Sequence, residues 1–337
     1  MAEKSRRITR TDVAQLAGVS TAVVSYVMNN GPRPVAPHTR KKVLEAVEAL
    51  GYQPSASARA LKLGMTSTYG LVILHVENAF HAQVVEAVDR TLSSRGLSMV
   101  LSMTHDDVDR ERVVLDQMIH RGVDGLMVLM SALSDSEWLA RRQSVPTILL
   151  DRDTGLEGYT TVGPDFEAGG YLATSHLIKH GAKRIIPVTG PLSPGNGNPR
   201  YDGYRRAMAE AKLDVLDPIT TEWSLVGGYT AGKVILDMAP RADAVFCFSD
   251  ALAIGLKHAF FKQSIRVPQD IAIVSFDGTD AAKFTYPQLT TVSQPLEPMV
   301  EFAVDSVSKR TSSDEYEHRS FPVELRIGNS CGCAVHQ

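Results

Sequence analysis

The chain has 337 residues, of which 44% are hydrophobic and 22% charged, so it can form two or three domains and a sizeable core. Its apolar runs are shorter than the roughly 18 residues of a membrane span. The charged N-terminus "MAEKSRRITRTD" also lacks the apolar segment of a secretory signal. These features count against an exported or membrane protein, and we expect a cytoplasmic one.

The net charge of −3 is unevenly distributed along the chain. Residues 1–65 contain ten Lys or Arg against four Asp or Glu, a net charge of +6, which leaves −9 for the remainder. A basic surface confined to the N-terminal part favours a nucleic-acid partner there.

Three cysteines limit the redox and metal chemistry. Cys331 and Cys333 are one residue apart near the C-terminus, and Cys247 stands in the apolar run "AVFCFSD". Three thiols cannot form a disulfide framework or a four-ligand zinc site. We therefore expect a reduced, cytosolic chain without a metal.

The stretch "TRTDVAQLAGVSTAVVSYVMNN", residues 9–30, predicts two short helices around a glycine turn. Thr11 is a candidate cap for the first helix, Gly18 supplies the turn, and Ser20 can cap the second helix. Helical spacing places five small or polar residues on one exposed face of the second helix: Thr21, Ala22, Ser25, Tyr26 and Asn29. Any helical hairpin could show this pattern, so the flanking sequence has to decide its role.

A third helix and a linker follow. In "APHTRKKVLEAVEALGY", Pro37 suits the first helical turn, and Val43, Val47 and Leu50 repeat on one side. The next stretch, "QPSASARALKLGMTS", is rich in Ser and Ala with few large apolar residues, and its composition alone is that of a linker.

Residues 9–64 closely resemble, in order and spacing, the headpiece of the lac repressor (LacI/GalR) family of bacterial transcription regulators. The resemblance implies a helix-turn-helix in the DNA major groove, a hinge helix that forms on operator DNA, and a leucine wedge at Leu61 in the minor groove. The DNA-binding residues that we expect are Thr11, Ser20, Thr21, Ala22, Ser25, Tyr26, Asn29, Arg40, Arg59, Leu61 and Lys62. Tyr26 and Ala22 stand where many family members carry arginine and a longer polar residue, so the operator sequence stays open.

From residue 68 onward, short apolar runs alternate with helical patterns. The expected strands are "YGLVILHV", "LSMVLSMT", "GLMVLM", "PTILLD", "RIIPVTG", "AVFCFSD" and "IAIVSFDG". Runs that are apolar on successive residues are typical of strands covered on both faces, and the alternation with helices favours doubly wound parallel sheets of the α/β class.

No enzyme motif is found in this part of the sequence. The loop "GPLSPGNGNPR" has Gly195 and Gly197, but Arg200 stands where a dinucleotide fingerprint needs glycine, and the lysine of a phosphate-binding loop is missing. GxSxG and HExxH are absent as well. We predict neither an enzyme nor a cofactor.

The resemblance extends over this body, through landmarks such as "RGVDGLMVL" and "RYDGYRRAM". It implies an effector domain similar to periplasmic sugar-binding proteins, with two subdomains, three crossovers near residues 163, 294 and 317, and a ligand cleft between the subdomains. The expected ligand-binding residues are Asn78, Phe80, His81, Asp151, Arg200, Trp223, Ser249, Asp250, Asp277 and Gln294. Asp250 can equally be a cap for the helix that follows it. Ser249 and Phe166 occupy positions where asparagine is frequent in the family.

The complete prediction is an all-α helix-turn-helix headpiece joined to an α/β, periplasmic-binding-protein-like effector domain. The expected ranges are 1–54 for the headpiece, 55–67 for the hinge and 68–337 for the ligand-binding and dimerisation domain. Within that domain, one subdomain takes 68–163 and 295–316, and the other takes 164–294 and 317–331.

The predicted function is a homodimeric repressor that a small sugar or related metabolite releases from a near-palindromic DNA operator. Two alternatives stay open. The ligand could act as a corepressor, or the chain could be a soluble sugar-binding protein without a DNA role. The basic headpiece and the missing export signal count against the latter.

Base recognition by the second helix can be tested with Tyr26→Arg. Arginine can donate two hydrogen bonds to guanine, whereas tyrosine offers one hydroxyl, so the preferred bases in each half-site should change. Lys41→Ala, which removes a phosphate contact, should weaken binding without changing the preference. Selection of binding sites from random double-stranded DNA measures both, and an unaltered motif for Tyr26→Arg would contradict the assignment.

Overall fold

The computed structural model describes residues 8–28, 33–53, 64–141, 144–152, 154–191, 197–309 and 316–333. Contacts divide the chain into two compact units, Met1–Thr66 and Ser67–Gln337, and each is described here by itself. Four of the expected DNA-binding residues lie outside the described residues: Asn29, Arg59, Leu61 and Lys62.

The first unit contains three helices, α1 (Arg10–Ala17), α2 (Thr21–Met28) and α3 (Pro37–Leu50). Their small core is formed mainly by Val13, Ala14, Ala17, Val24, Val27, Val43, Ala46 and Tyr52. Gly18 has φ 64°, which confirms the predicted turn. Ser20 Oγ accepts a hydrogen bond from the Val23 backbone N–H at 3.3 Å, as expected of a cap.

The predicted cap of the first helix was wrong. Thr9, not Thr11, is the N-cap of α1, because the Asp12 side chain reaches back to the Thr9 backbone N–H at 2.7 Å while Thr9 Oγ1 accepts from the Asp12 N–H. This reciprocal pair is a capping box. Thr11 lies one residue inside the helix with its side chain exposed.

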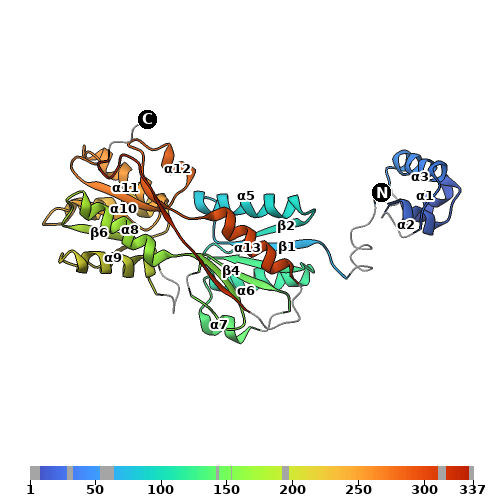
Figure 1. Cartoon of the computed structure of the whole chain (residues 1–337), viewed down its shortest axis with the longest axis horizontal. Coiled ribbons are helices and arrows are strands. Elements are labelled where there is room, and N and C mark those ends of the chain that lie inside the picture. The colour runs from blue at the N-terminus through green and yellow to red at the C-terminus, as the bar shows by residue number, and fades with distance from the viewer. Residues whose placement is uncertain are drawn as a thin grey trace, which may run out of the picture. The chain divides into compact units, whose positions relative to one another are not determined.

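The second unit contains two six-stranded sheets among the described residues (Figure 1). The first has the order β11-β5-β4-β3-β1-β2 and consists of β1 (Thr68–Ile73), β2 (Ser98–Met103), β3 (Gly125–Leu129), β4 (Thr147–Leu150), β5 (Thr160–Pro164) and β11 (His318–Phe321). The second has the order β12-β10-β9-β8-β6-β7 and consists of β6 (Ile185–Thr189), β7 (Ile219–Thr220), β8 (Ala244–Cys247), β9 (Ala272–Asp277), β10 (Thr290–Ser293) and β12 (Glu324–Arg326). All neighbouring strands are parallel except β12, which is antiparallel to β10.

Helices cover the faces of both sheets, which confirms the doubly wound arrangement (Figure 1). The helices around the first sheet are α5 (Ala79–Ser94), α6 (Val108–His120), α7 (Asp135–Ala140) and α13 (Leu296–Ser308), and those around the second are α8 (Phe166–Lys179), α9 (Pro199–Glu210), α10 (Leu225–Asp237), α11 (Asp250–Lys262) and α12 (Asp280–Lys283). Separate apolar clusters lie on the faces of each sheet, so each sheet has its own core.

The chain passes three times between the two sheets. It leaves the first sheet after β5, returns from β10 into α13, and crosses again between β11 and β12. The third crossing was expected near residue 317, but residues 318–321 form β11 and pair with β5 in the first sheet. The polar sequence "HRSF" gave no sign of this strand.

Helices α8 and α9 pack closely because glycines face the partner backbone. A Cβ on Gly203 would collide with the Glu167 carbonyl, and one on Gly170 would collide with the Arg200 carbonyl. The close packing places Arg200, in the first turn of α9, beside Phe166 at the start of α8.

Gly203→Ala should therefore destabilise the effector unit by about 1 to 3 kcal/mol, because the backbones of α8 and α9 must separate. Gly197→Ala is the matched control, since a Cβ there meets no atom within 4 Å. Urea unfolding of both variants measures the difference, and equal stabilities would show that the helix pair relaxes without cost.

Candidate functional site

A cavity of about 760 Å³ opens at the carboxyl ends of strands from both sheets. Such edges are where doubly wound folds bind ligands. Its lining includes eight of the ten expected ligand-binding residues: Asn78, Phe80, His81, Asp151, Arg200, Trp223, Ser249 and Asp277. The structure thus gathers side chains from positions as far apart in sequence as 78 and 277 around one space.

Asp277, the last residue of β9, lies between this cavity and a smaller one. It is 7% exposed and accepts hydrogen bonds from the Gln294 amide at 3.1 Å and, more weakly, from the Asp250 backbone N–H at 3.4 Å. Burial raises the pKa of Asp277 well above its ordinary value, and the negative charge of Asp250 adds to this effect, whereas the positive charge of Arg200 opposes it. A hydroxyl-rich ligand could supply further hydrogen bonds to this carboxyl.

Arg200 is held by aromatic rings. Its guanidinium carbon lies 4.0 Å from the centre of the Phe166 ring and 4.4 Å from that of Phe276, with Trp223 at 6.0 Å. Cation–π contacts of this kind orient the face of the guanidinium. Its N–H groups lie in the plane of the guanidinium, so they can still donate hydrogen bonds to a ligand. Phe166, which replaces a frequent asparagine, therefore positions the arginine.

On the side of the first sheet, His81 is buried and has a defined tautomer. Its Nδ1 lies 2.8 Å from the His75 carbonyl, which can only accept, so Nδ1 carries the proton of the neutral ring. Nε2, 3.4 Å from Met130 Sδ, is then an acceptor for a ligand hydroxyl. The pKa of His81 is lowered to about 4, chiefly by burial; the backbone hydrogen bond to His75 raises it, and the positive charge of His75 lowers it by a smaller amount.

Asn78 has a structural role as well as a place in the lining. Its Oδ1 accepts from the Phe80 backbone N–H at 2.9 Å and caps α5. The side-chain amide nitrogen is the part that could serve a ligand.

Four lining residues have backbone conformations that side chains rarely adopt. Asp106, Met130, Asp151 and Asp277 have φ values of 58°, 51°, 59° and 109°. Three of them directly follow or end strands β3, β4 and β9. Such strain is typical of functional sites, because the strand end must turn sharply to present its side chain.

Asp250 was expected to contact the ligand, but it is absent from the lining of the main cavity and its carboxylate is directed into the protein. One oxygen accepts from Ser275 Oγ at 2.6 Å and Thr291 Oγ1 at 2.7 Å, and the other from the N–H and hydroxyl of Thr279. The cap of α11 is Ser249, whose Oγ accepts from the Leu252 N–H at 3.2 Å. Ser249 stays in the lining of the cavity.

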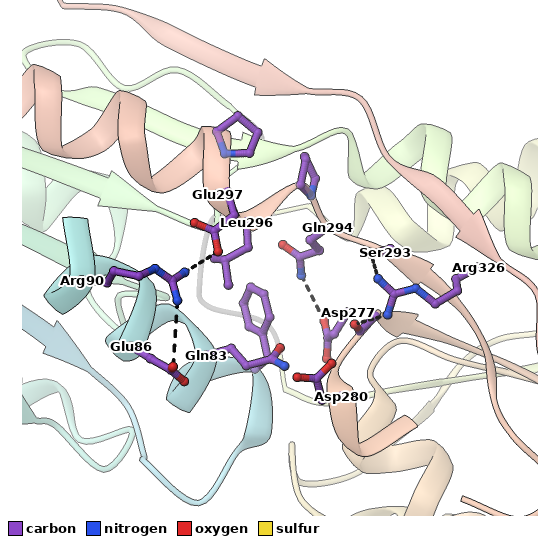
Figure 2. A pocket seen from close by; sticks show the side chains of 14 residues that line it. Gln83, Glu86, Arg90, Asp277, Asp280, Ser293, Gln294, Leu296, Glu297 and Arg326 are labelled. Atoms are coloured by element: carbon purple, nitrogen blue, oxygen red, sulfur yellow. Dashed lines mark hydrogen bonds and ion pairs between the residues drawn. The ribbon is translucent and has the colours of Figure 1, made fainter. Parts of the chain in front are cut away.

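Gln294 is also absent from the main cavity. It lines a second cavity of about 410 Å³, in which Figure 2 shows its amide directed at Asp277. Arg326 lies on the far side of Asp277 and donates to the Gly278 carbonyl at 2.8 Å and to Ser293 Oγ at 3.0 Å. Gln294 therefore acts on the cleft through Asp277.

The sequence reasoning missed several acidic lining residues. Glu77, Asp106 and Glu222 all face the main cavity from loops after or between strands. Asp106 lies shortly after the end of β2, as Asp151 lies after the end of β4. This position after a strand end could have marked Asp106 as a candidate ligand-binding residue.

In the first unit, the expected base-reading face is present on α2. Thr21 and Ala22 are exposed, and Ser25 and Tyr26 are half-buried. Arg40 lies in the first turns of α3. Val24 and Val27 point to the core, so the face is presented by the opposite side of α2.

Comparison with known proteins identifies the architecture. Residues 9–55 match the family of bacterial regulatory proteins of the lacI type, and residues 174–331 match a periplasmic binding protein-like domain. The chain is 37% identical over 329 residues to the ribose operon repressor of Escherichia coli K12, covering 96% of this chain and 99% of that one. The chain belongs to the lacI family.

Two further similarities agree. The repressor PurR of Vibrio parahaemolyticus is 34% identical over 324 residues, with 94% of this chain and 96% of the relative covered. A lac repressor dimer bound to operator and the anti-inducer ONPF superposes with a TM-score of 0.87 at 25% identity, covering 97% of this chain and 99% of the other. This lacI family member is thus a DNA-binding transcriptional repressor that responds to a small-molecule effector. Among its described residues, no helix is long and apolar enough to cross a membrane.

Buried His81 should make the effector unit sensitive to acid. Its pKa falls from 6.5 in the unfolded chain to about 4 in the folded one, so below pH 6.5 the unfolded state gains a proton that the native state does not. The stability from His81 is present above that pH and falls, by about 2 kcal/mol, between pH 7 and pH 5. Urea unfolding at both pH values should show a smaller loss for His81→Gln.

His120→Gln, at an exposed position on α6, is the control and should lose as much stability as the wild type. If His81→Gln behaves like this control, the ring is protonated in the folded protein and the tautomer assignment fails.

Proposed function

We propose that this repressor is a homodimer and that a neutral sugar releases it from a near-palindromic operator. The observation that carries the sugar assignment is the charge of the main cavity. Five carboxyl groups, from Glu77, Asp106, Asp151, Glu222 and Asp277, line it against one arginine, Arg200. An anionic or phosphorylated ligand would be repelled, whereas sugar hydroxyls can donate to the carboxylates and accept from the guanidinium.

The apolar part of the lining supports the same ligand class. Phe80 and Trp223 contribute ring surface, and the Trp223 Nε1–H is already directed at the Pro191 carbonyl at 2.9 Å. The ring is therefore held in place and can cover the C–H face of a pyranose or furanose. The ten proposed site residues divide into eight that can contact the ligand, with Asp250 and Gln294 supporting Asp277.

The relatives support the rest of the proposal. The ribose operon repressor is a match over almost the whole chain, and the lac repressor neighbour was solved as a dimer on operator DNA. A two-fold dimer recognises a near-palindromic site. Residues Thr21, Ala22, Ser25, Tyr26 and Asn29 would read bases, Thr11, Ser20, Arg40, Arg59 and Lys62 would meet phosphates or support the reading helix, and Leu61 would enter the minor groove. We place the chain in the cytoplasm, as a regulator without catalytic activity.

A second candidate is corepression by a purine base, because PurR repressors are similar over nearly the same length. The two candidate functions predict opposite effects of the ligand on operator affinity. An inducer lowers operator affinity and a corepressor raises it, because each ligand shifts the equilibrium toward the conformation that it binds better.

The deciding experiment uses the purified full chain and an operator selected from random DNA. Operator affinity is measured while D-ribose, other free sugars or a purine base is titrated. We expect a free sugar to lower the affinity. An increase with the purine base and no response to sugars would establish corepression instead.

Asp277→Asn tests the site itself. Asparagine replaces one carboxyl oxygen by an amide nitrogen and so removes a buried hydrogen-bond acceptor for the ligand, worth roughly 1.5 to 3 kcal/mol, so release should need about ten- to a hundredfold more sugar. Operator affinity without ligand should stay near normal. Asp280→Asn is the matched control, because this exposed carboxylate lines only the second cavity. Release of Asp277→Asn at the wild-type sugar concentration would remove Asp277 from the ligand site.

A further inference from the structure

Two histidines and two cysteines come together outside the ligand cleft. His176 lies in the last turn of α8, and His180, four positions further on, is the C-cap residue of the same helix. Cys331 and Cys333 follow β12 near the C-terminus. The Cys333 sulfur lies 3.6 Å from His176 Nε2 and 3.1 Å from His180 Nε2. We propose that these four side chains bind one Zn²⁺ ion.

The distances fit a metal site. The ligand atoms of His176, Cys331 and Cys333 all lie within 4.8 Å of one another. Zinc bonds of about 2.3 Å to sulfur and 2.0 Å to nitrogen in a tetrahedron place ligand atoms about 3.4 to 3.8 Å apart. His180 adjoins this group of three through its 3.1 Å contact with Cys333 Sγ, and rotation of its exposed side chain would bring Nε2 into the fourth position. No further thiol is needed, because the two histidines supply the third and fourth ligands beside the two cysteines.

A hydrogen bond to the first thiol supports its use as a thiolate. Thr290 Oγ1 accepts from the Gly328 N–H at 2.9 Å, and its own hydroxyl then donates to Cys331 Sγ at 2.9 Å. Donors directed at a ligand sulfur are typical of metal sites, where they orient the thiolate.

The surroundings favour a cation and leave it an entry path. The cluster lies at the C-terminal end of α8, where the helix dipole is negative. Cys331 is buried, Cys333 is half-buried and His180 is exposed, so an ion can enter from one side. Four protein ligands make a closed site, which is the arrangement of structural rather than catalytic zinc.

The site is separate from the effector cleft. Thr290 is the first residue of β10, whereas the main cavity opens at the carboxyl ends of the strands, where Asp277 ends the neighbouring strand β9. The zinc would tie the C-terminal segment to α8 near the amino end of β10, away from the main cavity. The sequence analysis expected no metal because it considered the three cysteines alone. It did not consider histidines that folding brings close to two of them.

The test uses the full chain, reduced, stripped with a chelator, exposed to Zn²⁺ alone and passed through a desalting column. Metal analysis should find about one zinc per chain. Cys333→Ser and His180→Gln should each weaken zinc affinity by at least about a hundredfold, because the binding free energy is shared among four ligands. The controls Cys247→Ala and His120→Gln keep the cluster and should bind as the wild type does.

Two further readouts identify the ligands. Co²⁺ in place of zinc should give the visible bands of tetrahedral coordination and a thiolate charge-transfer band, which Cys333→Ser should weaken. Free zinc at a thousandfold excess over the wild-type Kd should raise the thermal midpoint by about 5 to 10 °C in the wild type and in the two controls, and by no more than about a third as much in Cys333→Ser and His180→Gln. The proposal is overturned if the reduced wild type retains no zinc, if both cluster variants retain it fully, or if Co²⁺ shows no thiolate band.

Discussion

The buried carboxylate of Asp250 joins the elements that form one wall of the cleft. It accepts hydrogen bonds from Ser275 in β9, Thr291 in β10 and both the backbone and the hydroxyl of Thr279 before α12. Burial raises the pKa of Asp250, and these hydrogen bonds lower it. A buried acid is tolerated only when its lone pairs are used in this way. The strand end that carries Asp277 depends on this network for its position.

The fold could be predicted largely because buried parallel strands are apolar on successive residues. All seven runs chosen on that ground are strands: β1, β2, β3, β4, β6, β8 and β9. Five strands escaped prediction. Three of them, β7, β11 and β12, are short or polar strands at the edges of the sheets. The other two, β5 and β10, are buried but contain mainly threonine, glycine and serine, so they do not form an apolar run. Edge strands are half-exposed, so their residues need not be apolar, and pairing with a distant strand decides their structure.

The site was predictable to the extent that strand ends and family motifs mark it. Asp151, Arg200 and Asp277 were found in this way, and all three line the main cavity. The direction of a side chain was not predictable. Asp250 and Asp277 both follow buried strands, yet the hydroxyls around Asp250 turn it inward, whereas Asp277 faces the cavity. Those hydroxyls come from residues 25 to 41 positions away, a distance over which sequence patterns carry no information.

Because the chain crosses three times between the two sheets, neither sheet can be completed until the last crossing has been synthesised. Both sheets receive their last edge strands, β11 and β12, from residues 318–326, and the core of the first sheet includes Val300 and Val304 of α13. Until residues 318–326 have been synthesised, β5 and β10 therefore expose edges with unpaired backbone groups, and until α13 has emerged the apolar surface beneath it is open to solvent. Such edges invite aggregation. A chain terminated before residue 318 would leave both halves of the effector domain without an edge strand at once, so it should become a substrate for chaperones and proteases.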